Sequence, residues 1–177
     1  MDEKEMRNLL NRTINHCYVN LHARGNPLEE KNIRGMLTKI KNMLGEILCI
    51  TVEIKNIPGK GKKNEEKEEA NYLKDVVNEE MTKKQFRHWI HDANSIDHLL
   101  HQLNKRLEDP VIIIFHQFKL PNKEEEKNIL RSIRKFIQLR ESRLLKLLMV
   151  SSEKLDKWDL RPYSDMDERA VEYILYE

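Results

Sequence analysis

The chain has 177 residues, enough for one domain, and its charges nearly cancel to a net charge of +2, which argues against a general nucleic-acid binder driven by counterion release. Its longest uninterrupted apolar run, Val111–Phe115, is far shorter than the roughly 20 residues that a membrane helix needs, and the first residues are acidic where a signal peptide is basic. Both cysteines lie in apolar runs, which favours buried thiols in a reducing compartment, so we expect a single domain over residues 1–177 in the cytoplasm, without membrane contact.

The first part of the chain predicts two helices and two strands in alternation. Apolar residues at near-helical spacing indicate a short amphipathic helix over residues 1–15, and a strand is expected over His16–Leu21. After a cluster of breaker residues, apolar residues from Ile33 to Leu44 recur at i, i+3, i+4 and i+7, so this stretch predicts a helix that ends at Gly45. The stretch Ile47–Ile57 is rich in β-branched residues and predicts a second strand.

A charged tract separates this part from the next. Residues 59–70 consist largely of Lys, Glu, Asn and Gly with almost nothing to bury, so a flexible charged loop is expected there. Tyr72–Ile90 predicts a helix with breaks. Ser95–Leu107 predicts a more regular helix, with Asn94 or Ser95 as its N-cap.

The clearest pattern lies in the second half of the chain. Val111–Phe115 is a continuous β-branched run, which is typical of a strand covered on both faces of a parallel sheet. Leu144–Val150 predicts another such strand, and between them Lys123–Glu141 predicts a helix whose acidic start and basic end match the helix dipole. This order of elements forms a βαβ unit.

The last segment, Met166–Tyr176, predicts a final strand, with a helix capped by Ser164 as the alternative. Taken together, the elements predict an α/β domain, a three-layer sandwich with a mainly parallel sheet of four or five strands.

Four stretches in order along the chain carry a family resemblance. His16–Asn26 occupies the place of a first strand and its phosphate-binding loop, and Asp109–Phe118 is similar to a Walker B strand. Leu144–Ser152 is similar to a sensor strand, and Leu155–Glu172 to the segment before a last strand. The chain thus resembles P-loop NTPases, in particular the STAND class of prokaryotic signalling and defence proteins, and the resemblance implies a P-loop NTPase-like fold.

The groups that such proteins use for chemistry are missing at the matching positions. A phosphate-binding loop has the pattern G-x-x-x-x-G-K-[ST], whereas Leu21–Leu28 holds one glycine and no Lys followed by Ser or Thr. At the end of the Walker B-like strand, His116 and Gln117 replace the Asp and Glu that hold Mg²⁺ and orient water. We expect no catalytic residues and no cofactor.

Loss of both sites makes the chain similar to the inactive STAND-like domains of prokaryotic conflict systems. That resemblance implies a non-catalytic adaptor that acts through protein–protein interaction, for example in antiviral defence. The alternatives are a divergent nucleotide- or metal-dependent hydrolase and a nucleic-acid-binding accessory protein.

A cluster of four histidines is the candidate metal site of the hydrolase alternative. Its members are His88, His91, His98 and His101. Imidazole is the commonest transition-metal ligand, but H-x-x-H is poorer zinc spacing than H-x-x-x-H, and a predicted helix cap separates the two pairs. Surface or partly buried histidines are therefore the expected interpretation, and we assign no metal site.

A basic stripe on the predicted helix of residues 123–141 is the candidate interaction site. It consists of Lys127, Arg131, Arg134 and Lys135. The stripe is either an ordinary solvated helix face or a patch for an acidic protein or a nucleic acid. No aromatic residues interleave it, which disfavours stacking on single-stranded bases, so we expect a protein partner.

Overall fold

The computed structural model describes residues 4, 18–23, 30–57, 65–83, 93–117, 144–151 and 170–175. The helices and strands in these ranges are, in chain order, β1 (Tyr18–Ala23), α2 (Glu30–Leu44), β2 (Leu48–Glu53), the short 3-10 helix η1 (Ile54–Asn56), α3 (Glu65–Lys83), α4 (Ile96–Arg106), β3 (Val111–Gln117), β4 (Leu145–Ser151) and β5 (Ala170–Leu175). No helix in the described ranges is both long and apolar enough to cross a membrane.

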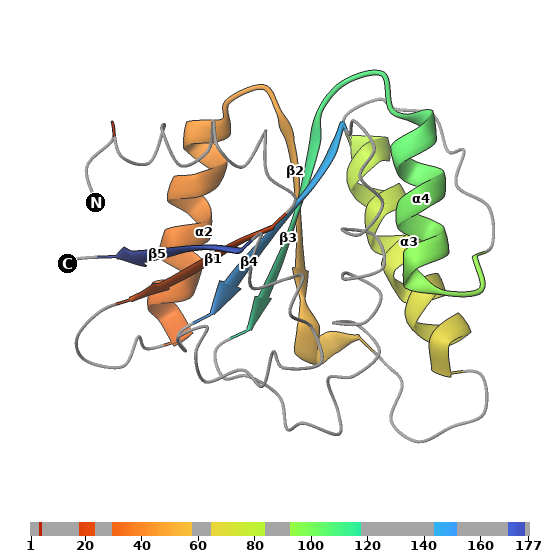
Figure 1. Cartoon of the computed structure of the whole chain (residues 1–177), viewed down its shortest axis with the longest axis horizontal. Coiled ribbons are helices and arrows are strands. Elements are labelled where there is room, and N and C mark those ends of the chain that lie inside the picture. The colour runs from red at the N-terminus through yellow and green to blue at the C-terminus, as the bar shows by residue number, and fades with distance from the viewer. Residues whose placement is uncertain are drawn as a thin grey trace.

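The strands form one sheet in the order β2-β3-β4-β1-β5, and every neighbouring pair is parallel. Helix α2 lies on one side of this sheet, and α3 and α4 lie on the other (Figure 1). The predicted α/β class and parallel sheet are therefore confirmed. Because all strands run the same way, their carboxyl ends meet at one edge of the sheet.

The core between the sheet and α3 with α4 follows from the alternation of side chains along the strands. In β2, the buried residues Leu48, Ile50 and Val52 join this core, and the residues between them are half-buried. In β3, Val111–Phe115 is buried throughout, as the unbroken β-branched run predicts for a strand covered on both faces. Each such buried apolar side chain contributes about 1.5–3 kcal/mol relative to exposure.

Helix α2 covers the opposite face of the sheet and ends where the sequence predicts. Its buried residues Leu37, Ile40 and Leu44 share one face at helical spacing. Gly45 follows with φ of 61°, and the Ile47 amide donates to the Leu44 carbonyl at 3.2 Å. This left-handed backbone conformation is the one that favours glycine just after a helix.

Helix α4 confirms the predicted periodicity and identifies its N-cap. The Ser95 side chain accepts a hydrogen bond from the backbone amide of His98 at 3.4 Å. The buried residues of α4 are Ile96, Leu99, Leu100 and Leu103. Of the two predicted caps, Ser95 is therefore the one used.

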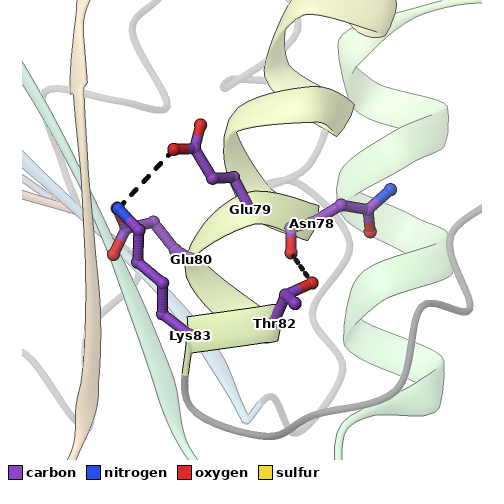
Figure 2. A network of polar contacts seen from close by, with 5 residues as sticks. All are labelled: Asn78, Glu79, Glu80, Thr82 and Lys83. Carbon is purple, nitrogen blue, oxygen red and sulfur yellow. Dashed lines mark hydrogen bonds and ion pairs between the residues drawn. The ribbon is translucent and has the colours of Figure 1, made fainter.

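The charged tract differs from its prediction at its second half. Residues 65–70, expected in a flexible loop, form the first turns of α3, with Glu69 6% exposed and Ala70 fully buried. Glu and Lys are good helix formers, so a tract of these residues is compatible with a helix once one apolar side packs. At the other end of α3, Thr82 donates to the Asn78 carbonyl at 2.7 Å (Figure 2).

Strand β5 confirms the prediction of a final strand over the last segment. It pairs with β1 over six residues, from Tyr18 with Ala170 to Ala23 with Leu175. Two other predicted elements, the helix of residues 1–15 and the helix of residues 123–141, lie outside the described residues, apart from Lys4, which is helical.

Candidate functional site

The carboxyl edge of the sheet is the natural place for a site, because ligands of open α/β sheets bind beyond the carboxyl ends of the strands. Three strands bring their last residues together there. Glu53 of β2 is paired with His116 of β3, and Gln117 of β3 is paired with Ser151 of β4. The end of β3 therefore lies between the ends of β2 and β4.

His116 is the half-buried titratable group of this edge. It follows Ile112 and Ile114 on the face of β3 that points toward α2, because alternate residues of a strand share a face. Burial lowers the pKa of His116, and the positive charges of Lys41, Lys55 and Arg34 lower it further, against an opposing effect of the Glu53 carboxylate. Burial therefore favours the neutral form of the imidazole, which can donate one hydrogen bond and accept another.

Glu53 is paired with His116 across β2 and β3, and both oxygens of its carboxylate have partners. Lys55 Nζ lies 3.0 Å from Glu53 Oε1, and Asn56 Nδ2 donates to Glu53 Oε2 at 3.1 Å. These two contacts come from η1, which turns the chain back at the end of β2. The carboxylate is thus engaged locally by a cation and an amide.

The structure does not bring the candidate metal ligands together at this edge. His98 and His101 lie on α4, on the other side of the sheet from the face that carries His116, and His88 and His91 lie outside the described residues. His98 Nε2 lies 3.0 Å from Gln102 Nε2, so it already has a partner. In the ranges that the structure describes, no group of three His, Cys, Asp or Glu residues could hold a metal ion.

The predicted interaction stripe cannot be placed relative to this site. Lys127, Arg131, Arg134 and Lys135 all lie outside the described residues, so the stripe stays a prediction.

One position at the start of α2 was missed in the sequence. The helix begins at Glu30, so Lys31 is its second residue and lies six residues after Gly25. That spacing is the spacing of the first glycine and the lysine in G-x-x-x-x-G-K-[ST], with Glu30 and Asn32 in place of the second glycine and the hydroxyl residue. The sequence search required Lys followed by Ser or Thr and therefore did not find Lys31, which is followed by Asn32. The start of α2 at Glu30 draws attention to this lysine.

Comparisons with known proteins bear on the fold. No protein-family model matches the sequence, and neither does any curated protein. Among solved structures, the Walker-type ATPase PABY2304 of Pyrococcus abyssi matches with a TM-score of 0.63 at 15% identity, over 99% of this chain and 54% of that one. The chain has a P-loop NTPase-like fold.

Two further P-loop NTPase-like matches agree with this conclusion. A chain from the Drosophila ORC structure with poly(dA/dT) DNA and Cdc6 matches with a TM-score of 0.55 at 8% identity, over 97% of this chain and 28% of that one. Cdc6p from Pyrobaculum aerophilum matches with a TM-score of 0.50 at 11% identity, over 97% of this chain and 45% of that one. The chain spans about half or less of the length of these three proteins. Its sequence identity to them is 8–15%, and similarity at this level shows the fold alone.

Proposed function

We propose that this P-loop NTPase-like chain is a non-catalytic adaptor, a module that acts through protein contacts rather than through nucleotide turnover. The observation that carries the proposal is the end of β3, where His116 and Gln117 stand beside Glu53 and Ser151. The resemblance to inactive STAND-like domains supports a place in prokaryotic defence or signalling.

The chemistry of triphosphate hydrolysis explains why this edge favours the proposal. Hydrolysis requires Mg²⁺ held by anionic oxygen and a residue that orients the attacking water. His116 offers a neutral imidazole, and Gln117 is an amide residue at the position next to it. The carboxylate of Glu53, which pairs with His116 across the sheet, already contacts Lys55 and Asn56. The positive charges near His116 further disfavour a divalent cation at this place.

Measuring phosphate release from Mg·ATP tests the proposal. We expect the rate in the presence of the purified chain to equal the rate in buffer. Release above that background that disappears in a His116→Ala variant would contradict the adaptor proposal, because it would give the end of β3 a part in turnover.

One observation favours a second candidate, a divergent nucleotide-dependent hydrolase. Lys31 stands at the start of α2 with the spacing of a phosphate-binding lysine after Gly25, and a helix N-terminus favours anions. Calorimetric titration with Mg·ATP separates the two candidates. Micromolar binding that is lost in Lys31→Ala and kept in Lys39→Ala, an exposed lysine of the same helix, would favour the hydrolase. The adaptor proposal expects no such binding.

A further inference from the structure

We propose that Glu53 and His116 form a pH-sensitive switch for η1 at the carboxyl edge of the sheet. While the imidazole is neutral, the Glu53 carboxylate holds Lys55 and Asn56 of η1. When the His116 imidazole takes up a proton from water, the carboxylate turns to the imidazolium and leaves both partners. The inference is independent of the proposed adaptor function, because it concerns how η1 is held and not whether nucleotide is hydrolysed.

The register of the sheet places the two side chains of the switch next to each other. Glu53 of β2 and His116 of β3 are paired residues of neighbouring parallel strands. Such residues point to the same face of the sheet, and neighbouring strands lie about 4.8 Å apart. A glutamate side chain that leaves its present partners can therefore reach the imidazole by rotation about its own bonds.

The present contacts of Glu53 tie η1 to the end of β2. Lys55 Nζ lies 3.0 Å from Glu53 Oε1, and Asn56 Nδ2 donates to Glu53 Oε2 at 3.1 Å. No residue of η1 is fully buried, and the backbone amide of Ile57 closes the turn by donating to the Ile54 carbonyl at 3.1 Å. Packing thus holds η1 only in part, so the two contacts of Glu53 contribute to its position.

Glu53 is the acidic group that a protonated His116 can turn to. The charged groups that act on the imidazole, in the part of the chain that the structure describes, come from β2, α2 and η1 and are Glu53, Lys41, Arg34 and Lys55. On β4, the residue paired with His116 is Val150, which carries no charge. A half-buried imidazolium needs an anionic partner, because burial removes the water that would otherwise solvate its charge.

The imidazolium is expected to compete with Lys55 for the carboxylate of Glu53. The Lys55 side chain is 54% exposed, and ion pairs of exposed lysines are weak because water solvates both charges. His116 is half-buried, so its charge interacts with Glu53 through a less polar medium. Burial and the nearby cations lower the pKa of His116 from its ordinary value of 6.5, so the contacts with η1 persist at neutral pH.

NMR spectroscopy between neutral and mildly acidic pH follows both ends of the switch. The ring resonances of His116 report its protonation, and the side-chain amide of Asn56 reports the contact with Glu53. We expect the Asn56 amide to shift with the same midpoint as the His116 ring. Hydrogen exchange of the Ile57 amide, corrected for its intrinsic rate, should accelerate about two- to fivefold on protonation, because the lost contacts are exposed and individually weak.

The Leu107 amide is a matched control within the same protein. It donates to the Leu103 carbonyl at 3.1 Å, at the end of α4 on the opposite side of the sheet. Its corrected exchange rate should not change as His116 titrates. An equal acceleration at Ile57 and Leu107 would indicate a general loosening of the fold and would overturn the inference.

Two substitutions at the switch keep the test informative if one of them impairs folding. His116→Gln removes the group that takes up the proton. Glu53→Gln keeps an oxygen that can accept from Asn56 but removes the negative charge. Both should abolish the acid-dependent changes at Asn56 and Ile57, whereas His98→Gln, which removes an exposed histidine of α4, should preserve them.

Two further results would overturn the inference. One is an Asn56 side-chain amide that does not follow the titration of His116. The other is an acid-dependent change at Asn56 that persists in His116→Gln or in Glu53→Gln. Neither result bears on the adaptor proposal, since that proposal is decided by phosphate release from Mg·ATP.

Discussion

Glu53 of β2 and His116 of β3 lie opposite one another as paired residues of two parallel strands, at the edge where the sheet ends. The carboxylate of Glu53 contacts Lys55, and burial lowers the pKa of the His116 imidazole. This arrangement gives the end of β3 a side chain that can both donate and accept a hydrogen bond. The same pair makes the stability of the protein depend on pH.

Replacing His116 by Gln should flatten the pH dependence of stability. Burial lowers the pKa of His116 from its ordinary value of 6.5, with Glu53 opposing and Lys41, Lys55 and Arg34 assisting. As pH falls through 6.5, the unfolded state therefore takes up this proton before the folded state does, and the free energy of unfolding decreases. Urea unfolding between neutral and mildly acidic pH should show this decrease in the wild type and a smaller one in the variant. Equal slopes would contradict the prediction.

Two glycines of the α2 region should respond in opposite directions to alanine. A methyl group added at either glycine would meet no neighbouring group within 4 Å, so a steric clash is not expected at either site. The two sites differ in their backbone conformation. Gly45→Ala should destabilise the fold by about 1–2 kcal/mol, because φ of 61° is left-handed, whereas Gly35→Ala inside the helix should stabilise it by about 0.5–1 kcal/mol. Chemical denaturation of both variants measures the free energies of unfolding. A loss of stability in Gly35→Ala would show that the helical backbone does not decide the effect there.

The residues that were predictable from sequence are those whose environment is set by their own stretch of chain. Val111–Phe115 could be predicted as a strand covered on both faces, because burial on both faces requires an unbroken apolar run. The end of α2 at Gly45 and the cap of α4 at Ser95 follow from local backbone chemistry. Such features do not depend on which strand lies beside which.

The residues that were not predictable depend on pairing between distant segments. The pairing of Glu53 with His116 needs the register of β2 on β3, and no local pattern contains that register. The start of α3 at Glu65 was missed because a Lys- and Glu-rich tract suits a solvated loop and a helix equally well, and only the burial of Glu69 and Ala70 decides between them.

Asn104 should contribute measurably to stability through a hydrogen bond between distant segments. Its Oδ1 accepts from the backbone amide of Leu145 at 3.2 Å, which ties the last turn of α4 to the first residue of β4. Asn104→Ala leaves that part-buried amide without its acceptor and should cost about 1–3 kcal/mol. Asn104→Asp keeps an acceptor oxygen and should cost less in urea unfolding at neutral pH. Equal losses in the two variants would contradict this role for the oxygen.

Cys49 should be an unreactive thiol at neutral pH. Burial raises its pKa to about 11, against a lowering effect of Lys41 and with a small raising effect of Glu80. Since the thiolate is the reactive form, alkylation by iodoacetamide should be slow at neutral pH and should accelerate as pH rises toward that pKa. Peptide mapping by mass spectrometry follows Cys49 by itself, and the same measurement in urea supplies the control, because unfolding removes the burial. Labelling of Cys49 in the folded protein as fast as in urea at neutral pH would show that the thiol is accessible and ionises normally.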